Sequence, residues 1–450
     1  MKRLVLIVWM LAIIGIDLYG QKPAVLPSPS QVKWADAEVG VLIHYGLWVY
    51  KSSDEGSATP LSAFNPSKLS TDQWVKAAKS AGATYAVLTV KHGPGFCFWP
   101  TKVPGYDYHI GNTPYKGGKG DVARDFVNSC KKYGIKPGFY YCIGNNSNHY
   151  LRGKNIPTKE ELEKYNQLEY QHLTELWNNY GKLFEIWFDG GVVEDKKAEV
   201  AVRISELLKK YQPEAITFQG PVDYENNIRW SGNEDGRGAY PNWSRADQAT
   251  SPDGNLISIP KNGGGNPDGK YWAPAEADMA NRKNSGWGWY ASKDYDEKHP
   301  PYSSDELLEH YYNSTGRNAN LMIGMAIDSS GSFPESNARI FEEFGNKLKQ
   351  RLQSTVGSVS GKGNSVTIKL PKAQDINQIE IREDITKGER IRSYVVEAFL
   401  GGNWKLLCDG SSVSHKRIQL FDKVKVSEVR LTITKSEGEP IIKKFAVFNY

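Results

Sequence analysis

The sequence predicts an α/β protein in which a TIM-like (β/α)-barrel is followed by an all-β sandwich domain. Its 450 residues are 39% hydrophobic and 12% aromatic, which is enough apolar material for a large core. Between residues 36 and 350, apolar runs typical of β-strands alternate with amphipathic stretches typical of helices. After residue 353 the pattern changes to short strands of alternating polarity. At about 150 residues per domain, this length accommodates one barrel and one smaller module.

The barrel prediction depends on the repeated order of one strand and one helix. Such alternation favours a parallel sheet with crossover helices. Seven or eight repeats of this kind fit a closed barrel better than an open sheet. The expected strands are 39–44, 85–90, 136–143, 183–188, 215–218 and 320–326. The expected helices are 71–80, 122–133, 159–177, 198–211, 305–312 and 336–352.

Residues 353–450 are predicted to form a separate β-sandwich. Glycines at 357, 361 and 363 give a linker-like stretch, and short strands follow at regular spacing. The expected strands are 366–370, 376–381, 394–400, 404–408, 417–420, 429–434 and 441–448. Two roles are open for this module. It supports the barrel, or it binds carbohydrate through a face that contains Arg392, Trp404 and His415.

The N-terminus is typical of a secretory signal peptide. Lys2 and Arg3 precede the apolar run 4–16, which is too short to span a bilayer, and Gly20 offers a cleavage position. The mature protein is therefore expected to be periplasmic or secreted, without a membrane anchor. The predicted division of the chain is a signal peptide at 1–20, a catalytic barrel at 21–352 and the C-terminal module at 353–450.

Several kinds of partner are not expected. The glycine clusters at 117–120 and 263–265 match neither the phosphate loop nor the dinucleotide fingerprint. The 56 Lys and Arg against 51 Asp and Glu give a net charge of +5, and no basic run would attract nucleic acid. The histidines form no His-x-His or His-Glu-x-x-His arrangement, so neither a metal site nor a cofactor is predicted. The sequence contains no Gly-x-Ser-x-Gly elbow, so a serine hydrolase is not indicated.

The four cysteines lack the paired spacing of a zinc motif or of a dense disulfide framework. They are Cys97, Cys130, Cys142 and Cys408. Buried free thiols and a single disulfide are both compatible with this pattern.

Reactive side chains of a barrel are expected at the C-terminal ends of its strands. His44 ends the first predicted strand and His92 follows the second, whereas Trp187 and Asp189 lie at the end of the fourth. Glu234 follows further along the chain. Aromatic faces stack on sugar rings, histidines and carboxylates hydrogen-bond sugar hydroxyls, and two carboxylates can hydrolyse a glycoside. The alternative is structural: a turn at Asp189, core positions for the rings and a solvated Glu234.

The order of these motifs resembles that of the α-L-fucosidases of glycoside hydrolase family 29, and most closely the branch that acts on α-1,3/1,4-linked fucose. The resemblance covers about residues 32–350, and the C-terminal strands are similar to discoidin-like modules. The motifs are His-Tyr-Gly-Leu-Trp at 44–48, Phe-Asn-Pro at 64–66, the segment 91–101, Trp-Phe-Asp-Gly at 187–190, Arg-Trp-Ser-Gly-Asn-Glu at 229–234 and Trp-Ala-Pro-Ala-Glu at 272–276.

This resemblance implies roles for individual residues. Asp189 corresponds to the family's nucleophile and Glu234 to the acid/base of this branch, with Glu276 as the second candidate. It implies an exported, retaining exo-glycosidase that removes terminal α-L-fucose from an oligosaccharide or glycoconjugate. Oligomeric state stays open. The residues implied to line the sugar pocket are His44, Glu55, His92, Trp187 and Trp287, with Trp289 as an alternative to the last.

The sequence departs from the family pattern at two places. Relatives read Lys-His-His-Asp-Gly-Phe where this chain has Gly93 and Pro94 after His92, and Gly56 stands where relatives carry a tryptophan. The loss of one hydrogen bond and one stacking face weakens fucose binding by roughly 1–3 kcal/mol. It also leaves room for a larger sugar. Two alternatives are therefore a glycosidase acting on α-L- or β-D-galactosides and a non-catalytic carbohydrate-binding protein.

Overall fold

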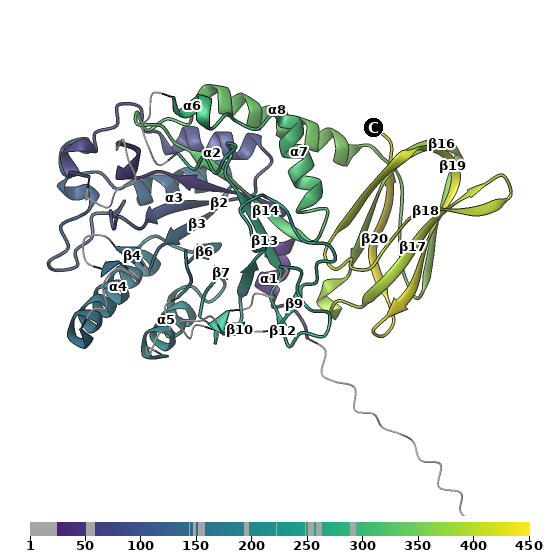
Figure 1. Cartoon of the computed structure of the whole chain (residues 1–450), viewed down its shortest axis with the longest axis horizontal. Coiled ribbons are helices and arrows are strands. Elements are labelled where there is room, and N and C mark those ends of the chain that lie inside the picture. Colours follow the sequence, from purple (N-terminus) through teal and green to yellow (C-terminus); the bar gives the residue numbers. More distant parts are fainter. Residues whose placement is uncertain are drawn as a thin grey trace, which may run out of the picture.

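The computed structural model describes two connected parts, a barrel and a curled antiparallel sheet (Figure 1). The described residues are 25–50, 59–143, 145–146, 150–151, 158–192, 198–221, 223–247, 249–250, 256–257, 263–288 and 294–450. The expected signal peptide lies outside these residues.

Eight parallel strands close the barrel in the order β1-β14-β13-β8-β7-β6-β3-β2. This confirms the predicted fold class. The strands are β1 (Val39–His44), β2 (Tyr85–Lys91), β3 (Lys136–Tyr141), β6 (Glu185–Trp187), β7 (Ile216–Phe218), β8 (Asn227–Trp230), β13 (Ala275–Met279) and β14 (Ala319–Ala326). Three small two-stranded sheets are made by β4 (Asn145–Asn146) with β5 (Tyr150–Leu151), β9 (Arg245–Ala246) with β12 (Tyr271–Trp272), and β10 (Ala249–Thr250) with β11 (Leu256–Ile257).

Helices follow the strands around the barrel, and their ends are set by local sequence. The hydroxyl of Thr158 accepts from the Glu161 backbone while the Glu161 carboxylate caps the Thr158 amide, so α4 begins here. Gly134, with φ of 71°, ends α3 in the left-handed region. The helices are α1 (Pro29–Ala35), α2 (Thr71–Ser80), α3 (Val122–Tyr133), α4 (Lys159–Asn179), α5 (Ala198–Tyr211), α6 (Tyr295–Lys298), α7 (Ser304–Asn313) and α8 (Glu335–Gln353). Short 3₁₀ turns occur at Leu47–Tyr50, Leu61–Ala63, Ile110–Asn112, Tyr115–Gly118 and Ile385–Lys387.

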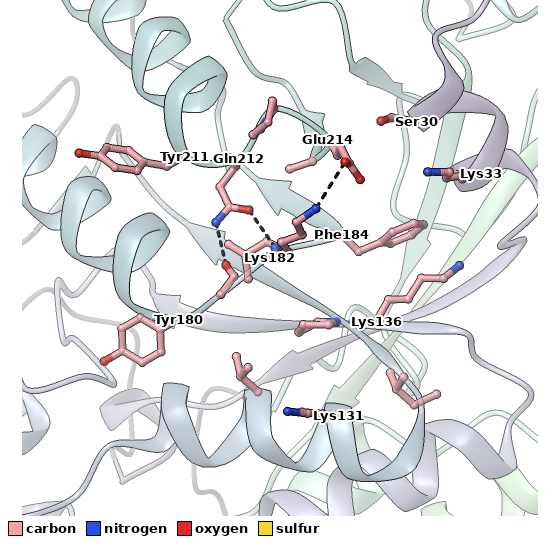
Figure 2. A pocket seen from close by; sticks show the side chains of 17 residues that line it. Ser30, Lys33, Lys131, Lys136, Tyr180, Lys182, Phe184, Tyr211, Gln212 and Glu214 are labelled. Atoms are coloured by element: carbon pink, nitrogen blue, oxygen red, sulfur yellow. Dashed lines mark hydrogen bonds and ion pairs between the residues drawn. The ribbon is translucent and has the colours of Figure 1, made fainter.

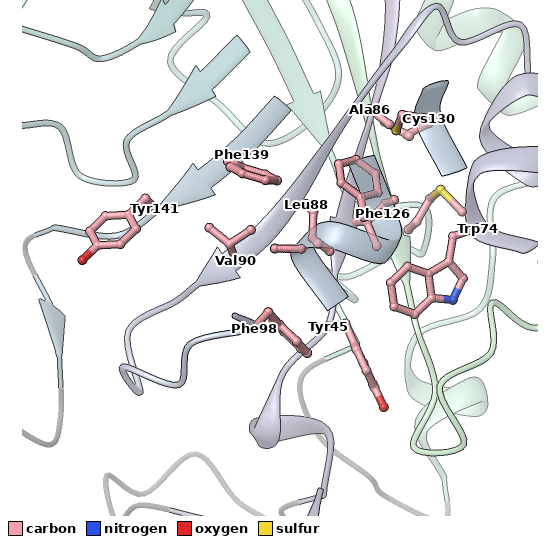
Figure 3. Packing of buried hydrophobic residues seen from close by; sticks show 14 of the residues in the cluster. Tyr45, Trp74, Ala86, Leu88, Val90, Phe98, Phe126, Cys130, Phe139 and Tyr141 are labelled. Atoms are coloured by element: carbon pink, nitrogen blue, oxygen red, sulfur yellow. The ribbon is translucent and has the colours of Figure 1, made fainter. Parts of the chain in front are cut away.

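Alternation along the strands separates two apolar cores. Outward side chains such as Leu88 and Phe139 pack against α2 and α3 (Figure 3). Inward side chains such as Tyr85 and Tyr140 fill the barrel interior. Gly40 makes room for this filling, because a Cβ there would lie 2.3 Å from the Tyr85 ring. Inward residues at strand ends are thereby aimed at the barrel mouth.

The C-terminal strands form one six-stranded antiparallel sheet that curls over its own core (Figure 1). The two strands predicted at 366–370 and 376–381 are one continuous strand, β16, with a register shift between Lys369 and Gln374. β19 likewise includes both 417–420 and 429–434. Such irregularities bend a long strand, which lets one sheet enclose a core. The strands are β15 (Thr355–Lys362), β16 (Ser365–Glu383), β17 (Ile391–Leu400), β18 (Asn403–Gly410), β19 (Arg417–Ser436) and β20 (Ile441–Phe448).

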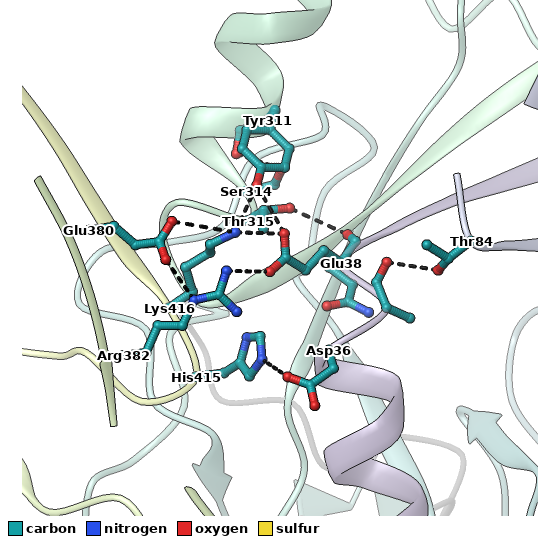
Figure 4. Close-up of polar contacts among 12 residues, drawn as sticks. Asp36, Glu38, Thr84, Tyr311, Ser314, Thr315, Glu380, Arg382, His415 and Lys416 are labelled. Atoms are coloured by element: carbon teal, nitrogen blue, oxygen red, sulfur yellow. Dashed lines mark hydrogen bonds and ion pairs between the residues drawn. The ribbon is translucent and has the colours of Figure 1, made fainter. Parts of the chain in front are cut away.

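A buried ionic cluster joins this sheet to the barrel (Figure 4). Glu38 of the barrel lies 2.6 Å from Lys416 Nζ and 2.8 Å from an Arg382 guanidinium nitrogen, both from the sheet. Arg382 also pairs with Glu380, and the Tyr311 hydroxyl of α7 donates to Glu38. Burial opposes ionisation of Glu38, but the charges of Lys416 and Arg382 hold its pKa below the usual value. We call Glu38, Tyr311, Glu380, Arg382 and Lys416 the interface cluster.

All four cysteines are described and are free thiols, three of them buried and Cys408 half-buried. Within the described ranges, no group of three or more His, Cys, Asp or Glu side chains is arranged to hold a metal ion. No helix among the described residues is long and apolar enough to cross a membrane.

Candidate active site

The C-terminal ends of the barrel strands bring four rings into one layer. His44 ends β1, His92 follows β2, Tyr140 lies in β3 and Trp187 ends β6. The rings of Tyr140 and His92 stack at 5.3 Å, and those of Tyr140 and Trp187 stack at 5.3 Å on the other side. The His44 ring lies 6.3 Å from the Tyr140 ring, at its edge. We call His44, His92, Tyr140 and Trp187 the ring layer, and it forms the floor of the barrel mouth.

Asp189 stands at the edge of the ring layer. Its Oδ2 accepts a hydrogen bond from the Tyr140 hydroxyl at 2.5 Å and lies 3.8 Å from His92 Nε2. Gly190 and Gly191 follow with φ of 71° and 79°, a backbone that glycine adopts without strain. This turn ends the strand right after the carboxylate. The side chain is 45% exposed, so a substrate can reach it.

Glu234 reaches the same layer from the loop after β8. Its Oε2 accepts a hydrogen bond from Trp287 Nε1 at 3.1 Å, and the side chain is exposed. The Trp287 ring packs against the His44 ring at 4.4 Å. Gly324 of β14 permits this position, because a Cβ there would lie 2.6 Å from the Trp287 ring. Asp189 is thus hydrogen-bonded to Tyr140 and Glu234 to Trp287, and both of these rings pack against His44.

Tyr140 donates a hydrogen bond to Asp189 and was not among the predicted site residues. Burial and the charges of Asp189, Cys142 and Glu234 all raise its pKa well above the usual value. The hydroxyl therefore stays protonated and donates to Asp189. In the predicted strand 136–143, Tyr140 shares a face with Gly138, but it is distinguished from Tyr141 only by the tertiary register, in which it pairs with Trp187. Trp48 was also missed, and its ring meets the edge of His92 at 5.3 Å.

The two histidines of the site are neutral at ordinary pH. Burial lowers the pKa of His92 to about 4, since the opposing effect of Asp189 is smaller and Lys91 adds to the lowering. Burial and the neighbouring His92 also hold the pKa of His44 well below its usual value. A neutral imidazole has one donor and one acceptor nitrogen. Such rings suit the hydroxyl groups of a sugar better than an anion.

Glu276, the second candidate for the acid/base, lies inside the barrel and away from solvent. Its two oxygens accept from Trp187 Nε1 at 2.8 Å and from the Tyr85 hydroxyl at 2.9 Å. Glu185 lies beside it, and burial together with the Glu276 charge holds the pKa of Glu185 well above its usual value, although Trp34 Nε1 donates a hydrogen bond to the Glu185 carboxylate. Burial raises the pKa of Glu276 to about 7. Ionisation of this pair is therefore disfavoured, and Glu276 is closed off from solvent whereas Glu234 is exposed, which favours Glu234 for the acid/base role.

Replacing Glu185 by glutamine should change how stability depends on pH. Because both carboxyl pKa values are raised in the folded state, the folded pair keeps a proton that the unfolded chain releases above about pH 4.5. Stability from this source is present at low pH and is lost as pH rises toward 7 and beyond. Urea unfolding from pH 5 to 8 should show Glu185→Gln gaining on the wild type by up to about 1.4 kcal/mol per pH unit.

The matched control for that experiment is Glu206→Gln, at an exposed position of α5. Its stability difference from the wild type should stay constant across the same pH range. A constant difference for Glu185→Gln as well would show that the buried carboxyl pair holds no extra proton.

Tyr140→Phe should lower kcat/KM about 10- to 100-fold, because Asp189 loses the charge-assisted hydrogen bond that orients it. The measurement is steady-state kinetics on an aryl glycoside, with near-UV circular dichroism to confirm the fold. Tyr141→Phe is the control, since Tyr141 points to the outer core and bonds His172 instead of Asp189. Activity of Tyr140→Phe within twofold of the Tyr141→Phe value would contradict a positioning role.

The structure brings six of the predicted site residues together. They are His44, His92, Trp187, Asp189, Glu234 and Trp287. Trp187 forms part of the floor, because its faces are covered by Tyr140 and by Phe218 at 3.8 Å. Glu55 and Trp289 lie outside the described residues.

The parallel barrel and the two carboxylates on a ring-lined mouth define the class of protein as a glycoside hydrolase. Residues 50–351 match the family model described as Alpha-L-fucosidase. The chain belongs to this family, glycoside hydrolase family 29.

Individual relatives are similar to this chain along almost its whole length. Alpha-L-fucosidase 1 of Arabidopsis thaliana is 28% identical over 465 residues, covering 94% of this chain and 87% of that protein. The crystal structure of a "putative alpha-L-fucosidase" from Bacteroides thetaiotaomicron VPI-5482 has 34% identity and a TM-score of 0.83, covering 95% of this chain and 100% of that one. A Ruminococcus gnavus GH29 fucosidase in complex with fucose shares the fold, with a TM-score of 0.79 at 22% identity over 94% and 95% of the two chains.

Proposed function

We propose that this α-L-fucosidase is an exported, retaining exo-glycosidase that removes terminal, α-1,3/1,4-linked fucose from glycans. The observation that carries the mechanism is that both carboxylates are hydrogen-bonded to neighbouring rings of one barrel mouth. Asp189 accepts from the Tyr140 hydroxyl and Glu234 accepts from Trp287 Nε1, and the His44 ring lies beside both the Tyr140 and the Trp287 rings. Retaining enzymes need a nucleophile and an acid/base separated by about 5–5.5 Å, whereas inverting enzymes need a wider gap for water.

In the first step, Asp189 attacks the anomeric carbon of the sugar and the bond from that carbon to the leaving oxygen breaks. Glu234 gives its proton to the leaving oxygen. Trp287 holds the other oxygen of Glu234, so the proton-bearing oxygen is directed to the substrate. The product is an ester between Asp189 and the sugar.

In the second step, water enters from the side that the leaving group has vacated. Glu234, now a carboxylate, takes a proton from the water, and the hydroxyl oxygen attacks the anomeric carbon. The ester bond breaks and Asp189 regains its negative charge. The Tyr140 hydroxyl stabilises that returning charge, so it assists the departure of the nucleophile.

The identity of the sugar rests on the neutral rings of the mouth and on the family. His44 and His92 offer donors and acceptors for sugar hydroxyls, while Trp287 and Trp48 offer apolar faces. Export rests on the signal-like segment at 1–20. The branched linkage rests on the motif that ends at Glu234, where the resemblance points to that branch.

One observation favours a galactoside as the second candidate substrate. Gly93 has no side chain where relatives place a hydroxyl-binding histidine, directly after His92 in the mouth. L-galactose is L-fucose with an added 6-hydroxyl group. A pocket with one wall group fewer accommodates that hydroxyl with the same two carboxylates and the same chemistry.

The test is an assay of the mature chain from Gln21 on nitrophenyl α-L-fucoside, α-L-galactoside and β-D-galactoside. Turnover of the fucoside, with release of α-L-fucose as the first product seen by NMR, would support the proposal. Turnover of a galactoside alone would keep the mechanism and change the substrate. Binding of fucosylated glycans without turnover of any substrate would show a carbohydrate-binding protein on this scaffold.

A further inference from the structure

A cavity lies at the N-terminal ends of the barrel strands, whereas Asp189 and Glu234 follow the C-terminal ends of theirs. Figure 2 shows the side chains that line it. Its volume is about 520 Å³, within the range of small-molecule sites in proteins. The walls come from α1, the end of α3, the start of β3 and the segment 180–184 before β6, together with the end of α5. These are the N-terminal ends of the strands, so the cavity is separate from the proposed reaction.

The floor of this N-terminal cavity is apolar and held in place. Ile135, Leu183 and Phe184 are among the apolar residues that line it. Gln212 fixes the surrounding backbone: its Oε1 accepts from the Leu183 amide at 2.9 Å, and its Nε2 donates to the carbonyls of Trp177 and Gly181 at 2.8 Å each. The cavity is therefore preformed, so a ligand would not need to order its walls.

The rim of the cavity carries four lysines, Lys33, Lys131, Lys136 and Lys182. Lys182 pairs with the one carboxylate of the rim, Glu214, at 3.4 Å. In the described part of the chain, the other three lysines have no ion-pair partner. Figure 2 shows Lys33 and Lys136 along one side, with Phe184 beside them. The rim thus has an excess of positive charge.

Lys136 lies against an aromatic ring of the cavity lining. Its ammonium nitrogen lies 4.4 Å from the centre of the Phe184 ring. Burial lowers its pKa, and the positive charge of Lys33 lowers it further against the opposing effect of Asp36. Asp36 itself is already bound by His415 at 2.8 Å and by Lys443 at 3.5 Å. Lys33 and Lys136 therefore lie near each other, and Asp36, the carboxylate that acts on Lys136, is bonded to residues outside the cavity.

From this geometry we infer that the N-terminal cavity binds a small amphipathic anion, with an apolar body against Phe184 and an acidic group between Lys33 and Lys136. An acidic group there would neutralise two neighbouring cations, and the apolar body would cover a preformed apolar floor. A neutral ligand would gain the second contribution without the first. The charge of the ligand is therefore the property that the experiment must isolate.

Two fluorescent probes with the same ring system provide that comparison. 8-Anilinonaphthalene-1-sulfonate carries one acidic group, and N-phenyl-1-naphthylamine is its uncharged counterpart. We expect the sulfonate to bind the full-length mature protein at least about tenfold more tightly than the amine. In the double variant Lys33→Met/Lys136→Met, the sulfonate should bind only as tightly as the amine. The affinity of the amine should stay within twofold of its wild-type value.

Two further variants test whether the probes bind in this cavity. Lys372→Met removes an exposed lysine of the C-terminal sheet and should change neither affinity. Val127→Trp puts a large ring into the cavity wall and should abolish binding of both probes. Glycosidase activity should stay unchanged in all variants, which verifies their fold. The inference is overturned if the amine binds as tightly as the sulfonate, if the double variant has no effect, or if Val127→Trp still binds the sulfonate.

Discussion

Replacing Asp189 by alanine is expected to abolish turnover, with a loss of kcat of about 10⁴-fold or more. The variant lacks the oxygen that attacks the anomeric carbon, and no other described carboxylate bonds Tyr140 at this position. Single-turnover and steady-state assays on an aryl α-L-fucoside measure the loss. The fold should be unaffected, because the side chain is 45% exposed and makes no buried ion pair.

The role of Asp189 as nucleophile can be separated from a role in binding. A slow, fluorinated fucosyl substrate should leave one sugar attached to the wild-type peptide that contains Asp189, as detected by mass spectrometry. Asp189→Asn should bind the same sugar without the attachment. Ordinary turnover by the alanine variant, or attachment at a different carboxylate, would refute the assignment.

Replacing Glu234 by alanine is expected to have the second largest effect, and one that depends on the leaving group. With a natural oligosaccharide, kcat should fall about 10²- to 10⁴-fold, because the departing oxygen receives no proton. With a nitrophenyl glycoside the first step should be much less affected. Azide, which attacks without a general base, should restore the second step and give a fucosyl azide.

Glu276→Gln is the comparison that distinguishes the two candidate acids. Its amide oxygen can still accept from Trp187, so the ring layer should persist and azide should have no effect. A leaving-group dependence in Glu276→Gln, together with an unaffected Glu234→Ala, would transfer the acid/base role to Glu276.

Much of the barrel could be predicted because most of its strands carry apolar side chains on both faces. β1 and β14 are buried along their whole length and gave continuous apolar runs. β8 and β13 gave no such run. β13 reads Ala-Glu-Ala-Asp-Met, with Glu276 and Asp278 buried in the barrel and alanines on the other face. Acidic residues that alternate with alanines are not typical of a buried strand. β13 can therefore be recognised only once the neighbouring strands are known.

The site could be predicted only to the extent that its residues follow a strand or belong to a family motif. Asp189, Glu234, His44 and His92 meet that condition. Tyr140 sits within a strand of aromatic residues, where the neighbour Tyr141 faces the outer core. Only the tertiary register separates the two tyrosines.

The hypothesis of a binding face on the C-terminal module is not supported at two of its three residues. His415 bonds Asp36 of the barrel, and Arg392 donates to the Pro267 carbonyl at 3.0 Å. Both side chains therefore face the barrel. Trp404 lies elsewhere, under the Arg430 guanidinium at 4.1 Å. These contacts favour the support role for the sheet.

The interface cluster has a consequence for how the protein folds and how it can be divided. Glu38 belongs to the barrel, but the cations bound to it belong to the sheet. In the intact protein, removing one of these cations alone would leave Glu38 buried with less compensating charge, which costs about 3–5 kcal/mol. A chain that ends after α8 would lack both cations, and the barrel face that the sheet covers would be exposed. The barrel and the sheet should therefore melt in one cooperative transition, and the sheet must accompany the barrel in any chimera or minimal version of the enzyme.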